Sequence, residues 1–329
     1  MIFNSPWFHE RILETDTERH PYFSKNATTN WFKALRFEIE SVHGITPQEQ
    51  FNSLRDFYRN SLSKYKGNIQ LGPIFEPLYF SILYSMSLDT FSLHLGLYPW
   101  ICPTAIVDWY YAIYFSARSI FASLGNDVDE DNAKSANFYV STIRTKLPYP
   151  FDMYAQKVDC SNYHPILSCA HNIVPYDKVR NFEESRSVAQ GMLLQYLNGT
   201  TKWYASRTKD NILQNHSEFS NFRKKAAREL LNKQLKDKIG FLHCAFRQRV
   251  KSNYRDAIYL TYGDDPTIHT KKFVGNLSFI AKFSSLISAA LIERRIGHDC
   301  IRDFKADLRY YLNGLHNSSE SERYWEVID

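Results

Sequence analysis

Apolar and aromatic residues recur at helical spacing along most of the chain. The densest stretch runs from Thr104 to Gly125 and is apolar or aromatic on almost every side. Thr104 suits a helix N-cap, and Gly125 suits the position just past a helix end. Because a helix that is apolar all round must be covered by other elements, we expect this one at the centre of the fold.

The same spacing predicts further helices. They cover residues 30–43 before Gly44, a segment from Thr46 towards Tyr65, one helix within 69–100, Ala133 to Lys146, 183–263 with breaks near Gly199 and Gly240, 276–296 and 298–312. Thr46-Pro47-Gln48-Glu49 has the order of an N-cap, a first-turn proline and an acidic first turn. Residues 1–27 are expected to form an N-terminal arm, and the proline-rich residues 147–182 an irregular connection. The sequence therefore predicts an all-α fold, a multi-helical bundle with additional basic helices.

Composition narrows the class of protein without naming an activity. Of the 329 residues 44% are hydrophobic and 23% charged, which is ordinary for a soluble globular protein. Five scattered cysteines and the absence of a signal-like N-terminus favour reduced thiols and a cytoplasmic location. The longest uncharged run contains two prolines, and Lys282 interrupts the next apolar run, so no membrane span is expected. We expect residues 1–182 to form a helical bundle and 183–329 a basic helical region, packed together as one unit.

Charge is concentrated in one stretch. Between Lys202 and Arg255 there are fourteen Lys and Arg residues against four Asp and Glu, a net charge of +10 in a chain of +5. Segregation of this size is typical of a phosphate-binding surface, although solvated helix faces give the same pattern. Interleaved aromatic residues such as Trp203 and Phe246 suit stacking on unpaired bases. The candidate nucleic-acid-binding residues are Arg223, Lys224, Lys225, Arg228, Arg247, Arg249, Lys251 and Arg255.

Metal and cofactor chemistry finds little support. The acidic turn 126–132 departs from a calcium loop at two positions and is expected to cap the next helix. Cys160, His164, Cys169 and His171 match no common zinc spacing. Phosphate-binding glycine loops and the G-x-S-x-G elbow are missing from the sequence. We therefore expect no metal and no cofactor.

The run from Tyr110 to Gly125, YYAIYFSARSIFASLG, resembles the YYAxFxxAR helix of the HEPN superfamily. The likeness covers about twenty residues and a plausible following helix. It implies a four-helix HEPN-like core and a place in a prokaryotic toxin–antitoxin or antiphage defence system. Active members of the superfamily are metal-independent ribonucleases with an Arg-x4–6-His pair, usually brought together across a dimer.

Two pairs have the required spacing, Arg36 with His43 and Arg309 with His316. Histidine moves protons near neutral pH and arginine holds a phosphate with a planar fork, so these residue types suit RNA cleavage. About two such pairs are expected by chance in this composition. Arg36 and His43 share one helix with Glu40 between them, which also fits an ordinary ion-paired surface, and they lie upstream of the aromatic helix rather than downstream.

The resulting hypothesis is a metal-independent endoribonuclease in which Arg36 steadies the phosphate and His43 moves the proton. Arg309 and His316 are the alternative pair. The rival hypothesis, from a different class, is a non-catalytic subunit that binds RNA or DNA through the basic half and uses the bundle as a homodimer or partner surface. A sensor for a nucleotide or a phage protein is a third possibility.

Overall fold

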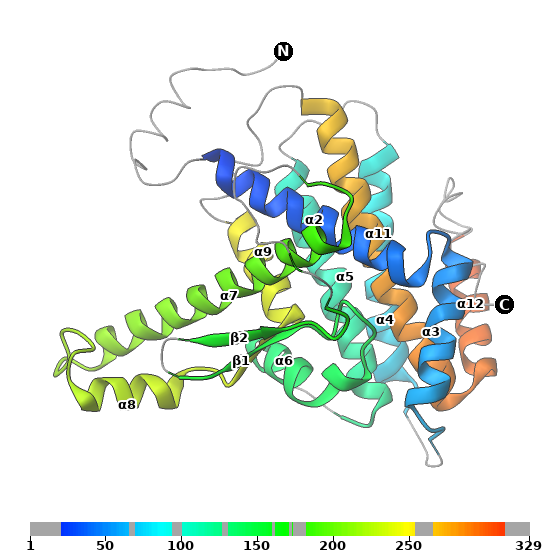
Figure 1. The fold of residues 1–329 in the computed structure, drawn as a ribbon. Helices are drawn as coiled ribbons and strands as arrows, with labels where there is room; N and C mark the ends of the chain where they lie inside the picture. Colours follow the sequence, from blue (N-terminus) through cyan, green and yellow to red (C-terminus); the bar gives the residue numbers. More distant parts are fainter. Residues whose placement is uncertain are drawn as a thin grey trace.

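The computed structural model describes residues 21–65, 70–93, 101–126, 131–159, 162–170, 173, 182–253 and 266–312. They form a mainly helical protein with one small sheet (Figure 1), which confirms the all-α prediction. The helices are α2 (Pro21–His43), α3 (Pro47–Ser61), α4 (Gly72–Leu93), α5 (Ile101–Ser123), α6 (Asn132–Phe138), α7 (Arg186–Asn215), α8 (Lys225–Gln234), α9 (Phe241–Asn253), α11 (Pro266–Ile296) and α12 (His298–Leu312). A π-helical turn, Tyr139–Ile143, and a 3-10 turn, Arg144–Lys146, follow α6.

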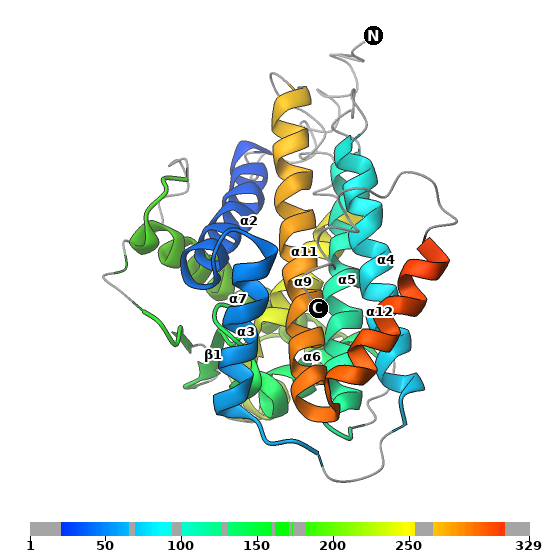
Figure 2. The same cartoon turned by 90° about the vertical axis from the view of Figure 1, so that its right-hand side faces the viewer.

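Helices α4, α5 and α11 pack against one another at the centre of the bundle. Figure 2 shows α2 and α3 on one side of α11 and α4 and α12 on the other. The α5 helix is buried along most of its length, as its apolar surface predicts. Helices α7 and α9 close the remaining side of the bundle, where α9 contacts α5 and α7 contacts α2.

Helix ends follow the chemistry of the residues that flank them. Gly44 and Gly125 have φ angles of 93° and 79°, the left-handed conformation that lets glycine end a helix. At the start of α3 the Thr46 side chain accepts a hydrogen bond from the Glu49 amide, and the Glu49 carboxylate accepts one from the Thr46 amide. This reciprocal capping box satisfies two amides that would otherwise lack partners.

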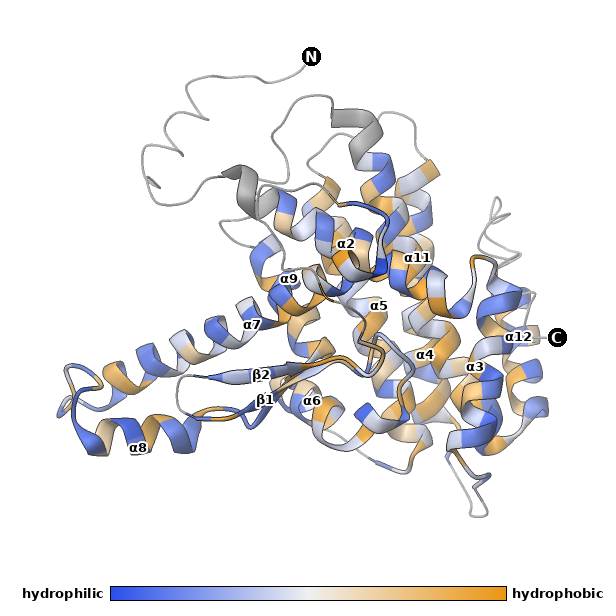
Figure 3. Ribbon diagram, viewed as in Figure 1, coloured by the Kyte–Doolittle hydropathy of each residue, from blue (hydrophilic) through white to orange (hydrophobic). Residues whose placement is uncertain are grey.

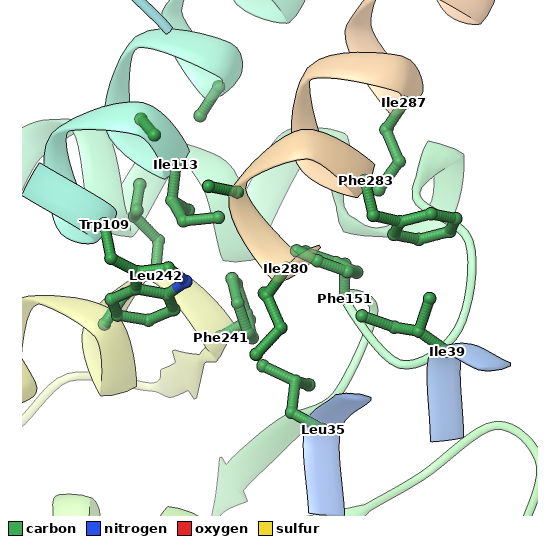
Figure 4. Packing of buried hydrophobic residues seen from close by; sticks show 14 of the residues in the cluster. Leu35, Ile39, Trp109, Ile113, Phe151, Phe241, Leu242, Ile280, Phe283 and Ile287 are labelled. Atoms are coloured by element: carbon green, nitrogen blue, oxygen red, sulfur yellow. The ribbon is translucent and has the colours of Figure 1, made fainter. Parts of the chain in front are cut away.

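Aromatic rings fill the core. Trp31 of α2 and Trp109 of α5 meet edge to face with centroids 5.7 Å apart, and Phe32 lies 4.8 Å from Trp109. Phe241 of α9 packs beside them and continues to Phe151 at 4.4 Å. Figure 4 shows Trp109, Phe241 and Phe151 converging with isoleucines of α2, α5 and α11. The buried cluster contains residues from both predicted regions, 1–182 and 183–329, so the two share one core.

Serine hydroxyls join the three central helices. Ser81 of α4 and Ser285 of α11 lie 2.7 Å apart, and Ser116 of α5 lies 2.6 Å from Ser288 of α11. Ser81 Oγ also donates to the backbone carbonyl of Ala112 in α5. Small side chains let helices approach closely, and the shared hydrogen bonds satisfy hydroxyls that are buried from water.

The structure departs from the predicted elements in several places. Helix α2 begins at Pro21, inside the predicted arm, and α5 begins at Ile101, so Thr104 lies within the helix and is not its N-cap. Residues 216–224 separate α7 from α8, where a continuous helix was expected.

Helix α7 runs through Gly199 without a break, and the Arg247 side chain packs 2.9 Å from the place where a Cβ would stand. Helix α11 begins ten residues before the expected start at 276. The structure also contains a small antiparallel sheet with the strand order β2-β1-β3. Its strands are β1 (Tyr154–Lys157), β2 (Tyr163–Ile166) and β3 (Lys238–Gly240). They lie in regions predicted to be irregular or helical. The break near Gly240 is confirmed, since β3 ends there.

Candidate nucleic-acid interface

Part of the basic segment projects away from the bundle. The outer half of α7, α8 and the chain that returns to β3 extend from it beside the β1–β2 hairpin (Figure 1). We call residues 202–238 the basic projection. It has a small core of its own, in which Ile212 of α7 meets Leu231 and Leu235, with partly buried Phe219 and Phe222 packed around them.

The base of the projection is anchored by the sheet and by side chains around it. Strand β3 pairs with β1, and Lys157 of β1 forms a 2.7 Å ion pair with Asp237. Tyr163 of β2 donates its hydroxyl hydrogen to the Lys236 carbonyl at 2.7 Å. The Lys236 ammonium in turn donates to Asn137 of α6 at 2.8 Å. The projection is therefore fixed to the bundle through several short contacts.

The side chains of the projection are strongly cationic and largely exposed. It contains ten Lys and Arg residues against four Asp and Glu, a net charge of +6. Figure 3 shows hydrophilic residues along α8 and the adjoining loop. The predicted residues Arg223, Lys224, Lys225 and Arg228 all lie exposed at the start of α8. Among them the structure shows one ion pair, a 3.7 Å contact between Lys225 and Glu229 that is exposed on both sides.

These four cations surround the N-terminus of α8, the positive end of the helix dipole. Cations are unfavourable at that end, and an anion there is favourable because backbone N–H groups point outward. The side chain of the N-cap, Lys224, makes no capping hydrogen bond to the helix. The local charge therefore opposes the helix dipole and favours an anion at this end of α8.

The predicted residues of α9 are placed differently. Arg247 stacks over the Tyr196 ring at 5.0 Å and donates to the Thr200 hydroxyl at 3.3 Å. Lys251 donates to the Thr28 hydroxyl at 3.3 Å. Both cations are half-buried on the bundle, away from the exposed set at α8. Arg255 lies outside the described residues. The segment that looks uniformly basic in sequence therefore divides into exposed and packed cations.

Arg249 is intermediate between these two groups. Its guanidinium lies over the rings of Tyr110 and Tyr111 at 5.4 and 5.2 Å. It also donates to the Tyr111 hydroxyl at 2.9 Å. Arg249 is half-buried on the side of α9 that meets α5.

The two members of the candidate catalytic pair have different surroundings. Arg36 donates to the Glu40 carboxylate at 2.8 Å and to the Asn276 side chain at 3.2 Å, and it stacks over Phe279 of α11. His43 is 6% exposed, and both of its ring nitrogens have partners. The ion-paired surface that the spacing allowed is therefore present for Arg36 and Glu40, whereas His43 faces the interior.

The hydrogen bonds of His43 define its protonation. Nε2 lies 2.7 Å from the Tyr149 carbonyl, which accepts only, so this nitrogen carries the hydrogen. Nδ1 lies 2.9 Å from Ser53 Oγ and accepts from it. Burial lowers the pKa of His43 below its usual 6.5, against the opposing effect of the Tyr149 hydrogen bond. A neutral, buried and doubly bonded imidazole has no nitrogen left to exchange a proton with RNA.

Only one residue of the alternative pair lies within the described residues. Arg309 is exposed on α12, and His316 lies outside the described residues. Helix α12, which carries Arg309, lies on the other side of α11 from α2 (Figure 2).

A buried acidic cluster was missed by the sequence analysis. Glu38 of α2 is fully buried and accepts from the Tyr149 hydroxyl at 2.5 Å and from the Gln190 amide at 3.2 Å. Arg186, partly exposed at the start of α7, approaches the same oxygen at 3.4 Å. Glu38 lies one turn after the buried Leu35, and it was assigned no role from the sequence because acids are seldom fully buried unless they are paired. The cluster ties α2, α7 and the loop after α6 together.

Metal binding gains no support from the geometry. Within the described ranges no group of three or more His, Cys, Asp or Glu residues is placed to hold a metal ion. Of the four residues considered for zinc, Cys160 and His171 lie outside those ranges, while His164 and Cys169 are exposed. Asp131 of the acidic turn caps α6 by accepting from the amides of Ala133 and Lys134, as predicted.

Within the part of the chain that the structure describes, one helix has the length and apolar character to cross a membrane. It is the Thr270–Ile296 part of α11, and 83% of its apolar window is buried inside the bundle. Core helices of folded domains show the same combination.

The chain matches no known protein-family model, no curated protein and no solved structure.

Proposed function

We propose that the protein binds nucleic acid through the basic projection and does not cleave it. The observation that carries this proposal is the cluster of exposed cations at the N-terminus of α8, held out from the bundle on a self-packed support. Phosphate contacts from Lys and Arg provide most of the affinity in non-specific nucleic-acid binding. The projection offers such contacts with its ammonium and guanidinium groups accessible.

The burial of His43 favours binding over catalysis. A ribonuclease of the kind suggested by the HEPN resemblance needs a histidine within reach of a 2′-hydroxyl or leaving oxygen. His43 is instead enclosed by Ser53 and Tyr149. In a toxin or defence setting the protein would act as a nucleic-acid-binding or assembly subunit. The free thiols of the buried Cys102 and Cys244 support a reducing, cytoplasmic compartment.

The test compares two triple variants with equal loss of charge. In the first variant Lys224, Lys225 and Arg228 are replaced by Gln. In the matched control the exposed residues Lys64, Lys271 and Lys272 are replaced by Gln. Affinity for a labelled 20-base-pair duplex is measured by fluorescence anisotropy between 50 and 200 mM salt. We expect the first variant to lose on the order of 100-fold in affinity at low salt and the log–log salt slope to fall by about 0.9 for each phosphate contact removed. The control should behave nearly as wild type.

Binding that is indifferent to salt, or equal loss in both variants, contradicts the proposal. The same samples decide the question of cleavage. Labelled RNA incubated with the protein in EDTA is expected to remain intact. Cleavage that disappears in an Arg36→Ala/His43→Ala or Arg309→Ala/His316→Ala variant would establish a ribonuclease instead.

A further inference from the structure

A continuous row of aromatic rings leads from the basic projection across the bundle. Trp203 of α7 lies 6.5 Å from Phe246 of α9, and Phe246 lies 6.1 Å from Tyr110 of α5. Tyr110 is buried and contacts Tyr111 at 5.4 Å. The row thus connects α7, α9 and α5 through rings that are far apart in the sequence.

The row continues onto α4. Tyr111 stacks on Tyr84 at 5.3 Å, and Tyr84 is nearly parallel to Phe115 at 5.9 Å with an interplanar angle of 8°. Phe115 then contacts Phe80 at 5.3 Å. We call the partly exposed members of this row the aromatic track: Trp203, Phe246, Tyr111, Tyr84, Phe115 and Phe80. Its last ring, Phe80, is 37% exposed.

Two arginines lie on rings of the track. Arg207, exposed on the projection, stacks over Trp203 at 4.9 Å, and Arg249 stacks over Tyr111 at 5.2 Å. The plane of a guanidinium on an aromatic face continues the stacking surface. Arg207 is exposed and can also contact phosphate, whereas Arg249 is half-buried and donates to the Tyr111 hydroxyl. The track therefore alternates flat apolar surface with positive charge, and it begins where the exposed lysines and arginines are.

Most rings of the track pack against the core, but unlike the fully buried rings they remain partly exposed. Phe219 and Phe222, also within the basic segment, pack into the small core of the projection. On α5 itself, Ser116 faces α11, whereas Tyr111 and Phe115 are on the partly exposed side. Asp108 lies near Tyr84 on this side of α5. Burial raises the pKa of the Asp108 carboxyl, and the Ser87 hydroxyl donates a 2.6 Å hydrogen bond to that carboxyl.

We propose that the aromatic track binds the unpaired bases of a single-stranded nucleic acid whose phosphates are held by the basic projection. This inference rests on the proposed function and names its substrate class. Base stacking on aromatic side chains tolerates any sequence because every base has a flat face. A duplex keeps its bases stacked on one another and gains nothing from the track.

The experiment separates bases from phosphates. Three labelled probes are used: an oligothymidylate 20-mer, an abasic 20-mer with the same phosphodiester backbone, and a 20-base-pair duplex. Wild-type protein is expected to bind the oligothymidylate roughly tenfold more tightly than the abasic strand, since stacking on even one base contributes that much. A Trp203→Leu/Tyr111→Leu/Phe115→Leu variant should bind both strands equally and retain its duplex affinity.

Controls address folding and position. Leucine keeps apolar volume at these half-buried sites, and far-UV circular dichroism with a melting curve checks that the variant folds. The matched control replaces Phe75 and Phe304, a stacked pair 4.8 Å apart on α4 and α12 that is not part of the track, by Leu. It should keep the tenfold preference. Tyr111→Phe, which retains the ring, should also keep it.

The outcomes distinguish the two proposals. Equal wild-type affinity for the oligothymidylate and abasic strands, or a preference that survives the triple track variant, overturns the track while leaving the projection as a phosphate-binding element. Absence of binding to all three probes overturns both. Loss of the preference in the Phe75/Phe304 control would likewise show that the effect is not specific to the track.

Discussion

The bundle and the basic projection use similar residues in opposite ways. In the bundle, Arg247 and Lys251 of α9 are engaged by a ring and by hydroxyls of neighbouring helices. In the projection, Lys224 and Arg228 extend into solvent from a helix supported by a small apolar cluster. Net charge in a sequence therefore does not measure the charge that is available to a ligand. Availability depends on whether aromatic and hydroxyl partners surround each cation.

The largest expected loss of stability comes from a substitution in the bundle core. Trp109→Ala should lower the free energy of unfolding by about 3–5 kcal/mol, because a fully buried indole in contact with Trp31, Phe32 and Phe241 is removed. Urea denaturation followed by far-UV circular dichroism measures the loss. A change below about 1 kcal/mol would mean that this core relaxes around the cavity far more readily than its packing indicates.

In the projection, Leu231→Ala should act locally. The small cluster with Ile212 and Leu235 can collapse around the lost atoms, so we expect about 2 kcal/mol, confined to the projection. Hydrogen exchange followed by mass spectrometry should show faster exchange in α8 and in the outer half of α7, with protection in α5 and α11 unchanged. Faster exchange throughout the chain would show instead that the projection and bundle unfold as one unit.

His243, at the junction of projection and bundle, should make stability depend on pH. Its Nδ1 accepts the Gly240 amide at 3.2 Å and its Nε2 contacts Asn137 at 3.0 Å. Burial, with a smaller effect of Lys236, lowers the pKa of His243 from 6.5 to about 3. The unfolded chain therefore binds a proton that the folded chain does not, and this contribution to stability is lost as pH falls from 6.5 towards 3.

Between pH 6.5 and pH 5 the expected loss from His243 is about 2 kcal/mol, at about 1.4 kcal/mol per pH unit. The buried His43, whose pKa is also lowered, acts in the same direction. Urea unfolding of wild type and His243→Gln at pH 7 and pH 5 isolates the contribution, because the glutamine side chain does not titrate. An identical pH dependence in the two proteins would contradict this assignment.

The smallest expected effects on stability come from replacing one cation in each region. Arg247→Ala should destabilise by about 1 kcal/mol, since it removes a hydrogen bond to Thr200 and a stacking contact with Tyr196. Lys224→Ala should change stability by less than about 0.5 kcal/mol, as is usual for exposed positions. Thermal melts of both variants measure the difference. Equal destabilisation would remove the distinction between packed and available cations.

Local chemistry made several elements predictable. The capping box at Thr46 and Glu49 and the terminal glycines at 44 and 125 depend only on neighbouring residues, and each was found where the sequence predicted it. The burial of α5 followed from its apolar surface. Non-local features were not predictable in the same way. Strands β1 and β3 have only four and three residues, and their pairing joins distant parts of the chain.

The candidate site was predictable only as a concentration of charge. Arg247, for example, is engaged by Tyr196 and Thr200, which lie on another helix. The residues next to Arg247 in the sequence do not predict these contacts. The same holds for His43, which spacing places on the face of Arg36. The loop that contains Tyr149 covers the end of α2 and turns that position into an interior one.

The hydroxyl contacts among α4, α5 and α11 have a consequence for how this sequence is free to diverge. At Ser81, Ser116, Ser285 and Ser288 each side chain is both a spacer and a hydrogen-bonding partner for the opposite helix. A bulkier residue would separate the backbones, and alanine at one position would remove the hydroxyl-to-hydroxyl contact between the two helices. Change at these sites is therefore expected to occur in matched pairs, and covariation between them would identify distant relatives that share this three-helix centre.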